Sequence, residues 1–166
     1  MKRHDMTLLA IYLNDHLAGV ITGRELARRM LSAAVDDERR ALASDLAEHF
    51  LDSEHEIERL IVETGSRRSL LKGWLAWAAE KAGRLKLNGH ITSRSPLSDL
   101  VELEGIMVLL EYEQELWRSL QQLASPPELA RASREFAARE EQARSHLDRC
   151  AERSRTLAAG RLNAEM

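Results

Sequence analysis

The chain has 166 residues, 44% of them hydrophobic and 31% charged, which suits one domain with a buried core. Only three prolines and eight glycines interrupt it, aromatic residues make up 4%, and the abundance of Leu, Ala, Glu and Arg favours helices over strands. No stretch approaches the roughly 18 apolar residues of a membrane span, polar residues at 14–16 exclude a signal-peptide core, and the single Cys150 excludes an internal disulfide. We therefore expect a cytoplasmic protein with no membrane association and a reduced thiol.

Hydrophobic periodicity and turn signals divide the chain into five helices within one domain spanning residues 1–166. Their expected ranges are about 5–33, 36–64, 69–87, 96–124 and 127–158, and the tail 160–166 is expected to fray. In the first helix, inward positions alternate spacings of three and four, as in a bundle seam. These positions are Leu9, Leu13, His16, Val20, Gly23, Ala27 and Met30. The second helix has a similar seam and starts after a short loop, so the two are expected to form an antiparallel hairpin.

The remaining segments predict a second hairpin and a crossover. The run GIMVLL at 105–110 makes the helix at 96–124 apolar around most of its circumference, so we expect it to be central. Ser125-Pro126-Pro127 then breaks the chain before the last helix. Two hairpins joined by a long connection predict an all-α, ferritin-like antiparallel four-helix bundle, with helix 69–87 as an additional crossover helix. A five-helix bundle of other connectivity is the alternative.

Polar residues on the apolar seams are the candidate functional groups. His16 lies within the seam of the first helix, His49 lies beside that of the second, and Glu140 replaces an apolar residue in the last. Glu104 and Glu111 share one face of the helix at 96–124. Counting residues from the turns predicts that Glu111 and Glu140 face each other, with both histidines near the same level. In contrast, Glu54, Glu56 and Glu58 are expected to form a solvated face.

Two interpretations of this polar level remain open. In one it is a metal site for iron or manganese, because imidazole and carboxylate groups at one level can bind a transition metal. The candidate ligands are His16, His49, Glu111 and Glu140, with Glu104 and His146 as second choices. In the other it is a polar core layer, in which histidines hydrogen-bond to carboxylates and fix helix register. No catalytic motif and no motif for an organic cofactor is recognised.

Charge is distributed unevenly along the chain, although the net charge is only −3. Residues 36–64 carry ten acidic and three basic residues, a net charge of −7, and residues 97–124 carry −5. Residues 65–96 carry +6, so this basic segment is expected to lie across acidic neighbours or to form a docking surface at 67–94. Nucleic acid is an unlikely partner, since no recognised motif accompanies the basic segment. A homo-oligomer is left open.

Several segments resemble short bacterial ferritin-like helical-bundle proteins of unsettled function. The similar stretches are YLNDHLAG (12–19), ELARR (25–29), WAAEKAGRLKLNG (77–89) and SPLSDLVELEG (95–105). The resemblance implies a four-helix bundle with a long crossover. Ferritin-like di-iron proteins carry Glu-x-x-His on two helices, and this chain contains no such motif, so no ligand is carried over by position.

We therefore expect a non-enzymatic binding or scaffold protein with a polar core layer. The alternative is a metal-binding oxidase related to the di-iron-carboxylate proteins, or a metal-handling protein. Fold analogy alone does not decide between them, because one fold hosts many functions.

Overall fold

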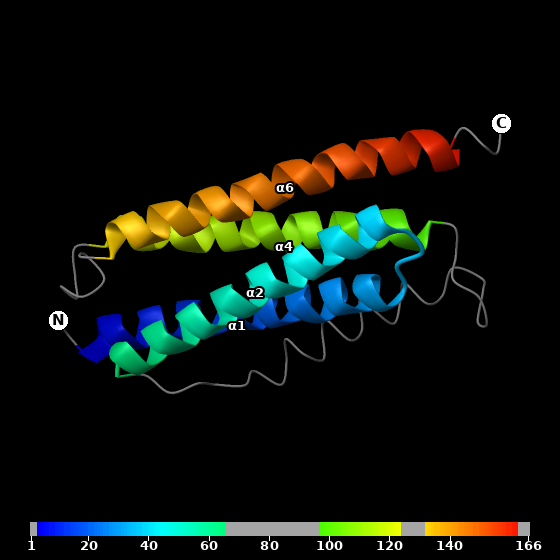
Figure 1. Ribbon diagram of the computed structural model, residues 1–166. Helices are drawn as coiled ribbons and strands as arrows, with labels where there is room; N and C mark the ends of the chain where they lie inside the picture. The colour runs from blue at the N-terminus through cyan, green and yellow to red at the C-terminus, as the bar shows by residue number, and fades with distance from the viewer. Residues whose placement is uncertain (1–2, 66–96, 124–131, 163–166) are drawn as a thin grey trace.

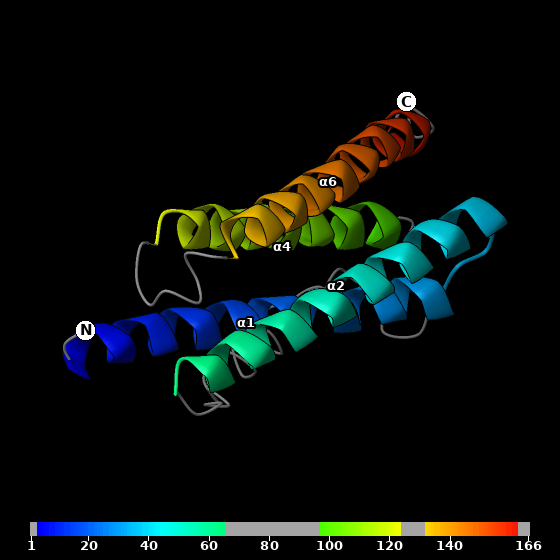
Figure 2. The same ribbon diagram turned by 60° about the vertical axis from the view of Figure 1, so that its left-hand side comes forward.

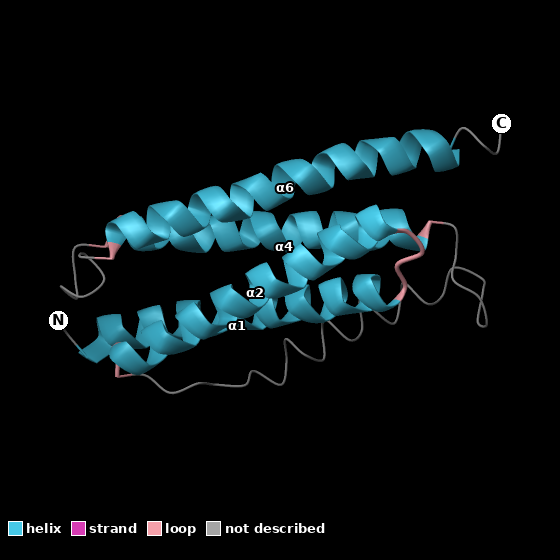
Figure 3. Ribbon diagram, in the orientation of Figure 1, coloured by secondary structure: helices cyan, strands magenta, loops and turns pink. Residues whose placement is uncertain are grey.

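The computed structural model describes residues 3–65, 97–123 and 132–162, and these residues form four long helices (Figures 1 and 3). The helices are α1 (Arg3–Ser32), α2 (Asp37–Glu63), α4 (Ser98–Gln121) and α6 (Ser133–Leu162). The prediction of an all-α, four-helix bundle with antiparallel packing is confirmed. The helix predicted at 69–87 and the basic segment 67–94 lie outside the described residues. The last helix continues through Gly160, where fraying was expected to begin, as far as Leu162.

Two hairpins form the two layers of the bundle. The most extensive helix contacts are α1 with α2 and α4 with α6, and α1 with α4 joins the two pairs. Figures 1 and 2 show the α4–α6 pair lying over the α1–α2 pair. Contacts between α2 and α4 ascend together in both helices, from Arg39–Asp99 to His49–Glu113. These two helices therefore run in the same direction, whereas each hairpin is antiparallel.

The α1–α2 hairpin depends on a helix cap and on a close approach of the two helices. Asp36 precedes α2 and accepts a hydrogen bond from the backbone N–H of Arg39 at 2.7 Å, which satisfies one donor of the first turn. Gly23 in α1 lies directly against the ring of Phe50 in α2, because a Cβ at Gly23 would be 2.6 Å from that ring. The small residue therefore lets the two helices pack closely.

Apolar side chains from all four helices fill the interior. The fully or almost fully buried ones include Leu13, Leu17, Val20, Leu46, Phe50, Ile57, Leu60, Leu103, Ile106, Leu110, Trp117 and Phe136. The expectation that the helix at 96–124 is central is only partly met, since Val108 remains 65% exposed. α4 packs against α1 and α6 and leaves one face to solvent. No helix in the described part of the chain is long and apolar enough to cross a membrane.

Candidate functional site

The most deeply buried polar group at mid-bundle is the carboxylate of Glu113 on α4. It accepts hydrogen bonds from His49 Nε2 at 3.0 Å and Ser53 Oγ at 2.6 Å, both on α2. A third comes from Trp117 Nε1, one turn further along α4, at 2.9 Å. Glu113 is completely buried, so these donors replace the water that an ionised carboxylate requires.

These hydrogen bonds set the charge state of Glu113. Burial alone would raise its pKa, but the hydrogen bonds from His49, Ser53 and Trp117, together with the electrostatic attraction of His49, lower the pKa below its ordinary value. Three donors directed at one carboxylate stabilise its ionised form. Glu113 is therefore a buried anion at neutral pH.

Two further histidines bring α1 and α6 to the same level. His16 on α1 stacks on Tyr112 with ring centroids 3.8 Å apart, and its Nδ1 is buried without a hydrogen-bond partner among the described residues. His146 on α6 lies beside His49, with ring centroids 4.5 Å apart. Burial lowers the pKa of both His16 and His146 to about 4, against the attraction of Glu113. Each helix thus contributes one group to the mid-bundle cluster: His16, His49, Glu113 and His146.

The predicted residues fall into two groups. His16 and His49 are buried at mid-bundle, and His146, a second choice, lies with them. Glu104 and Glu111 are exposed on α4. The four first-choice ligands His16, His49, Glu111 and Glu140 are therefore not brought together.

The prediction that Glu111 and Glu140 face each other is wrong. Glu140 accepts a hydrogen bond from Gln121 at 2.7 Å and pairs with Arg118 at 2.9 Å, and these partners lower its pKa. Along α6 it lies between the buried Phe136 and Ala143, but its side chain turns to the edge and remains 24% exposed. The long side chain can leave the apolar interior because partners lie within reach on α4.

Sequence reasoning missed Glu113, although a signal for it exists. The buried positions Leu103, Ile106 and Leu110 alternate spacings of three and four, and continuing this rhythm reaches Glu113 and Trp117. Reading the face instead from the apolar run at 105–110 shifted it towards Glu104 and Glu111. The inward face of α4 is identified correctly only when the repeat is followed from Leu103 to Trp117.

Glu54 and Glu56 on α2 were expected in solvent and are buried instead. Arg24 lies 2.5 Å from Glu54, and Arg59 lies 2.5 Å from Glu56. The guanidinium groups compensate the two carboxylates, whose burial would otherwise be costly. Periodicity does not reveal this burial, because Glu54 depends on Arg24 of α1, and Glu56 has Arg139 of α6 at 3.7 Å besides Arg59 of its own helix.

The mid-bundle donor set does not fit a di-iron-carboxylate centre. Such centres take glutamates from all four helices together with two histidines, whereas one carboxylate lies in this cluster. Both of its oxygens are engaged: Oε1 accepts from Ser53 and Trp117, and Oε2 faces His49. Across the described ranges, no group of three or more His, Cys, Asp or Glu residues is arranged to hold a metal ion.

Cys150 is a buried thiol on α6, as expected. Burial raises its pKa to about 12, so the reactive thiolate is strongly disfavoured. It therefore behaves as a small apolar group of the core.

Comparison with known proteins identifies no family. No protein-family model matches the chain, and no curated protein or solved structure is significantly similar to it. The resemblance to ferritin-like proteins stays a prediction, and function has to be inferred from the arrangement of the described residues.

Proposed function

We propose that this protein is a non-enzymatic binding or scaffold protein with ferritin-like connectivity, in which the mid-bundle polar layer fixes the alignment of the two hairpins. The observation that carries this proposal is the saturation of Glu113 by His49, Ser53 and Trp117. Because both oxygens of this carboxylate already accept hydrogen bonds, Glu113 is better suited to fixing how the helices pack than to binding an exchangeable ligand.

The direction of the helices supports the ferritin-like part of the proposal. α2 and α4 run in the same direction, so α2 ends at the opposite end of the bundle from where α4 begins (Figure 1). Hairpins related in this way require a connection that returns along the bundle, as in ferritin-like folds.

The energetic asymmetry of Glu113 supports the alignment role. Shifting α2 by one turn along α4 would break both present hydrogen bonds, and because His49 and Ser53 are one turn apart, only one of them could then face Glu113. An uncompensated buried charge costs about 3–5 kcal/mol, which is a large part of the stability of a small domain. Apolar contacts alone discriminate poorly between registers, whereas a buried polar pair penalises the wrong one.

A metal-handling protein or metal-dependent oxidase is the second candidate, with iron or manganese as the metal. The observation that favours it is that three histidines lie near the level of Glu113: His49 is hydrogen-bonded to it, His146 lies beside His49, and the charge of Glu113 acts on His16. In that case the hydrogen bonds at Glu113 would have to give way to metal–ligand bonds.

Metal analysis of protein purified without a histidine tag separates the two candidates. For the scaffold we expect iron, manganese and zinc far below one equivalent and the same melting temperature with and without EDTA. A parent with at least about one equivalent, destabilised by EDTA and losing the metal in Glu113→Gln, would establish the second candidate instead.

The alignment role has its own test in the double variant His49→Leu/Glu113→Leu. We expect it to remain helical but to show more than one set of amide resonances, because the residue pair that excludes other registers is gone. Leu46→Met, a conservative change on α2, is the matched control and should retain a single set. A single sharp set of resonances in the double variant would refute the alignment role.

A further inference from the structure

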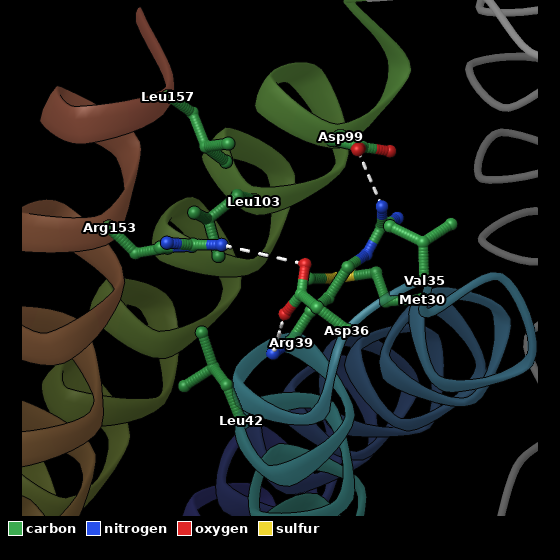
Figure 4. A pocket seen from close by; sticks show the side chains of 9 residues that line it. All are labelled: Met30, Val35, Asp36, Arg39, Leu42, Asp99, Leu103, Arg153 and Leu157. Atoms are coloured by element: carbon green, nitrogen blue, oxygen red, sulfur yellow. Dashed lines mark hydrogen bonds and ion pairs between the residues drawn. The ribbon is translucent and has the colours of Figure 1, made fainter. Parts of the chain in front are cut away.

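A pocket of about 190 Å³ lies at the end of the bundle where α2 and α4 begin and α6 approaches its C-terminus (Figure 4). All four helices line it, together with the loop between α1 and α2. Its lining residues are Met30, Val35, Asp36, Arg39, Leu42, Asp99, Leu103, Arg153 and Leu157. The pocket shares no residue with the mid-bundle cluster.

The lining is divided between apolar and charged side chains. Leu42, Leu103 and Leu157 come from three different helices and give one side an aliphatic surface (Figure 4). Arg39 enters from α2 and Arg153 from α6. Such a combination suits a ligand with an apolar body and one polar end.

Arg39 is the group that specifies the polar end. It is only 8% exposed, and its Nη1 donates to Asp99 at 2.5 Å. Its Nη2 is buried and forms an ion pair with Glu102 at 3.8 Å, but it donates no hydrogen bond to any described residue. A buried guanidinium nitrogen without an acceptor is costly, so an acceptor atom supplied by a ligand would be stabilised there.

Arg153 offers a second cation at the same pocket. Its Nη1 donates to Glu38 at 3.0 Å, and its Nη2 forms a longer ion pair with Asp36 at 3.9 Å without a hydrogen bond (Figure 4). The acids on the wall already have basic or backbone partners: Asp99 pairs with Arg39, and Asp36 caps α2. The N-termini of α2 and α4 at this end further favour a negative charge.

We propose that this pocket binds a small carboxylate with a short apolar chain. The carboxylate accepts a hydrogen bond from Arg39 Nη2 and is attracted by Arg153, and the chain lies against the three leucines. The pocket volume of about 190 Å³ limits the size of the ligand. Drug-sized ligands occupy about 300–1,000 Å³, whereas a cavity of about 150 Å³ holds benzene. Hexanoate is therefore a suitable probe.

Titration of the full chain with hexanoate, followed by amide NMR, tests the proposal, with hexanol and hexylamine as uncharged and cationic comparators. We expect hexanoate to bind most tightly and to shift amide resonances around Asp36 and Leu157. Arg153→Gln should weaken binding about tenfold or more, as loss of a charge-assisted contact does. Arg149→Gln is the matched control on α6, since Arg149 pairs with Asp45 and does not line the pocket.

A second variant separates the pocket from general charge effects. Leu157→Trp adds side-chain volume inside the pocket and should abolish the hexanoate shifts, while circular dichroism verifies the helical fold. Equal binding of hexanol or hexylamine would overturn the assignment of a carboxylate. Equal loss in Arg149→Gln and Arg153→Gln, or no shift with hexanoate at all, would overturn the site.

Discussion

At the scale of single residues, Glu113 is held by His49 and Ser53 from α2 and by Trp117 from its own helix. Glu113→Leu leaves these three donors without their acceptor and should lower the free energy of unfolding by roughly 3–6 kcal/mol, at about 1–2 kcal/mol for each donor. Glu113→Gln keeps one oxygen for Ser53 and Trp117, and its amide can donate to the other tautomer of His49, so about 1 kcal/mol is expected. Urea denaturation measures both. Equal losses would mean that charge, rather than hydrogen bonding, determines the contribution of Glu113.

Acidification should act on the protein through His16. Burial lowers its pKa from 6.5 to about 4, so between these values the unfolded chain binds a proton that the folded protein does not. The free energy of unfolding is then fully maintained above about pH 6.5 and declines as the pH falls towards 4, by up to about 3 kcal/mol for this group. His146, whose pKa is also lowered to about 4, adds to the loss in the same direction.

Denaturation measured across this pH range, with two histidine variants, tests the assignment. His16→Phe keeps a ring against Tyr112 and should reduce the decline to the part that His146 contributes, whereas His55→Gln changes an exposed histidine and should leave the decline unchanged. The decline would have another origin if both variants showed the parent slope.

The sequence predicted the burial of individual residues better than their partners. His16 and His49 could be placed inside because both recur with apolar neighbours at helical spacing. Glu140 lies in its predicted seam, yet Arg118 draws its side chain to the edge. A helical repeat specifies an angular position, whereas the direction of a long side chain depends on groups from another helix.

At the scale of helices, close approach depends on small residues at particular positions. Gly23→Ala places a Cβ about 2.6 Å from the ring of Phe50, so α1 and α2 must separate or the ring must move. We expect a destabilisation of about 1–3 kcal/mol despite the better helix propensity of alanine. Gly160→Ala in α6 meets nothing within 4 Å and should stabilise by about 0.5–1 kcal/mol. Thermal denaturation of both variants compares them. A stable Gly23→Ala protein would show that the hairpin tolerates a wider spacing.

The helices themselves were largely predictable, since long amphipathic segments with few prolines leave little choice of secondary structure. The predicted α2 range of 36–64 and the observed Asp37–Glu63 differ by one residue at each end. The orientation of α4 was harder to infer. Its run at 105–110 is apolar on every side, so the inward face becomes clear only from the longer repeat that includes Glu113.

At the scale of the whole molecule, the two seams between the hairpins differ in chemistry. The α1–α4 seam includes stacked rings and a glycine in close contact, with His16 on Tyr112 and Leu26 against Gly105. The α2–α6 seam is bridged by arginines of α6 that pair with the acids of α2. These pairs are Arg139–Glu56, Arg149–Asp45 and Arg153–Glu38. The acidic segment 36–64 thus finds part of its positive charge on α6, which composition alone did not indicate.

Burial, rather than the number of pairs, should decide which charges stabilise the bundle. Arg39 is almost fully buried and pairs with Asp99 and Glu102 on α4, so Arg39→Met withdraws a cation from two acids in a site of low dielectric constant. We expect a loss of about 3–5 kcal/mol, as for breaking other buried pairs. Arg149 and Asp45 are each nearly half exposed, so Arg149→Met should change the free energy of unfolding by less than about 1 kcal/mol.

Denaturation at low and high salt completes this comparison. About 0.5 M NaCl should remove the small effect of Arg149→Met, since exposed charges are screened, and should leave most of the Arg39→Met effect. A large, salt-sensitive loss in Arg149→Met would instead show that the arginine bridges of the α2–α6 seam hold the hairpins together. If the expected result is obtained, the buried contacts of α1 and α2 with α4 hold the two hairpins together. The α2–α6 seam is then the one that opens more easily.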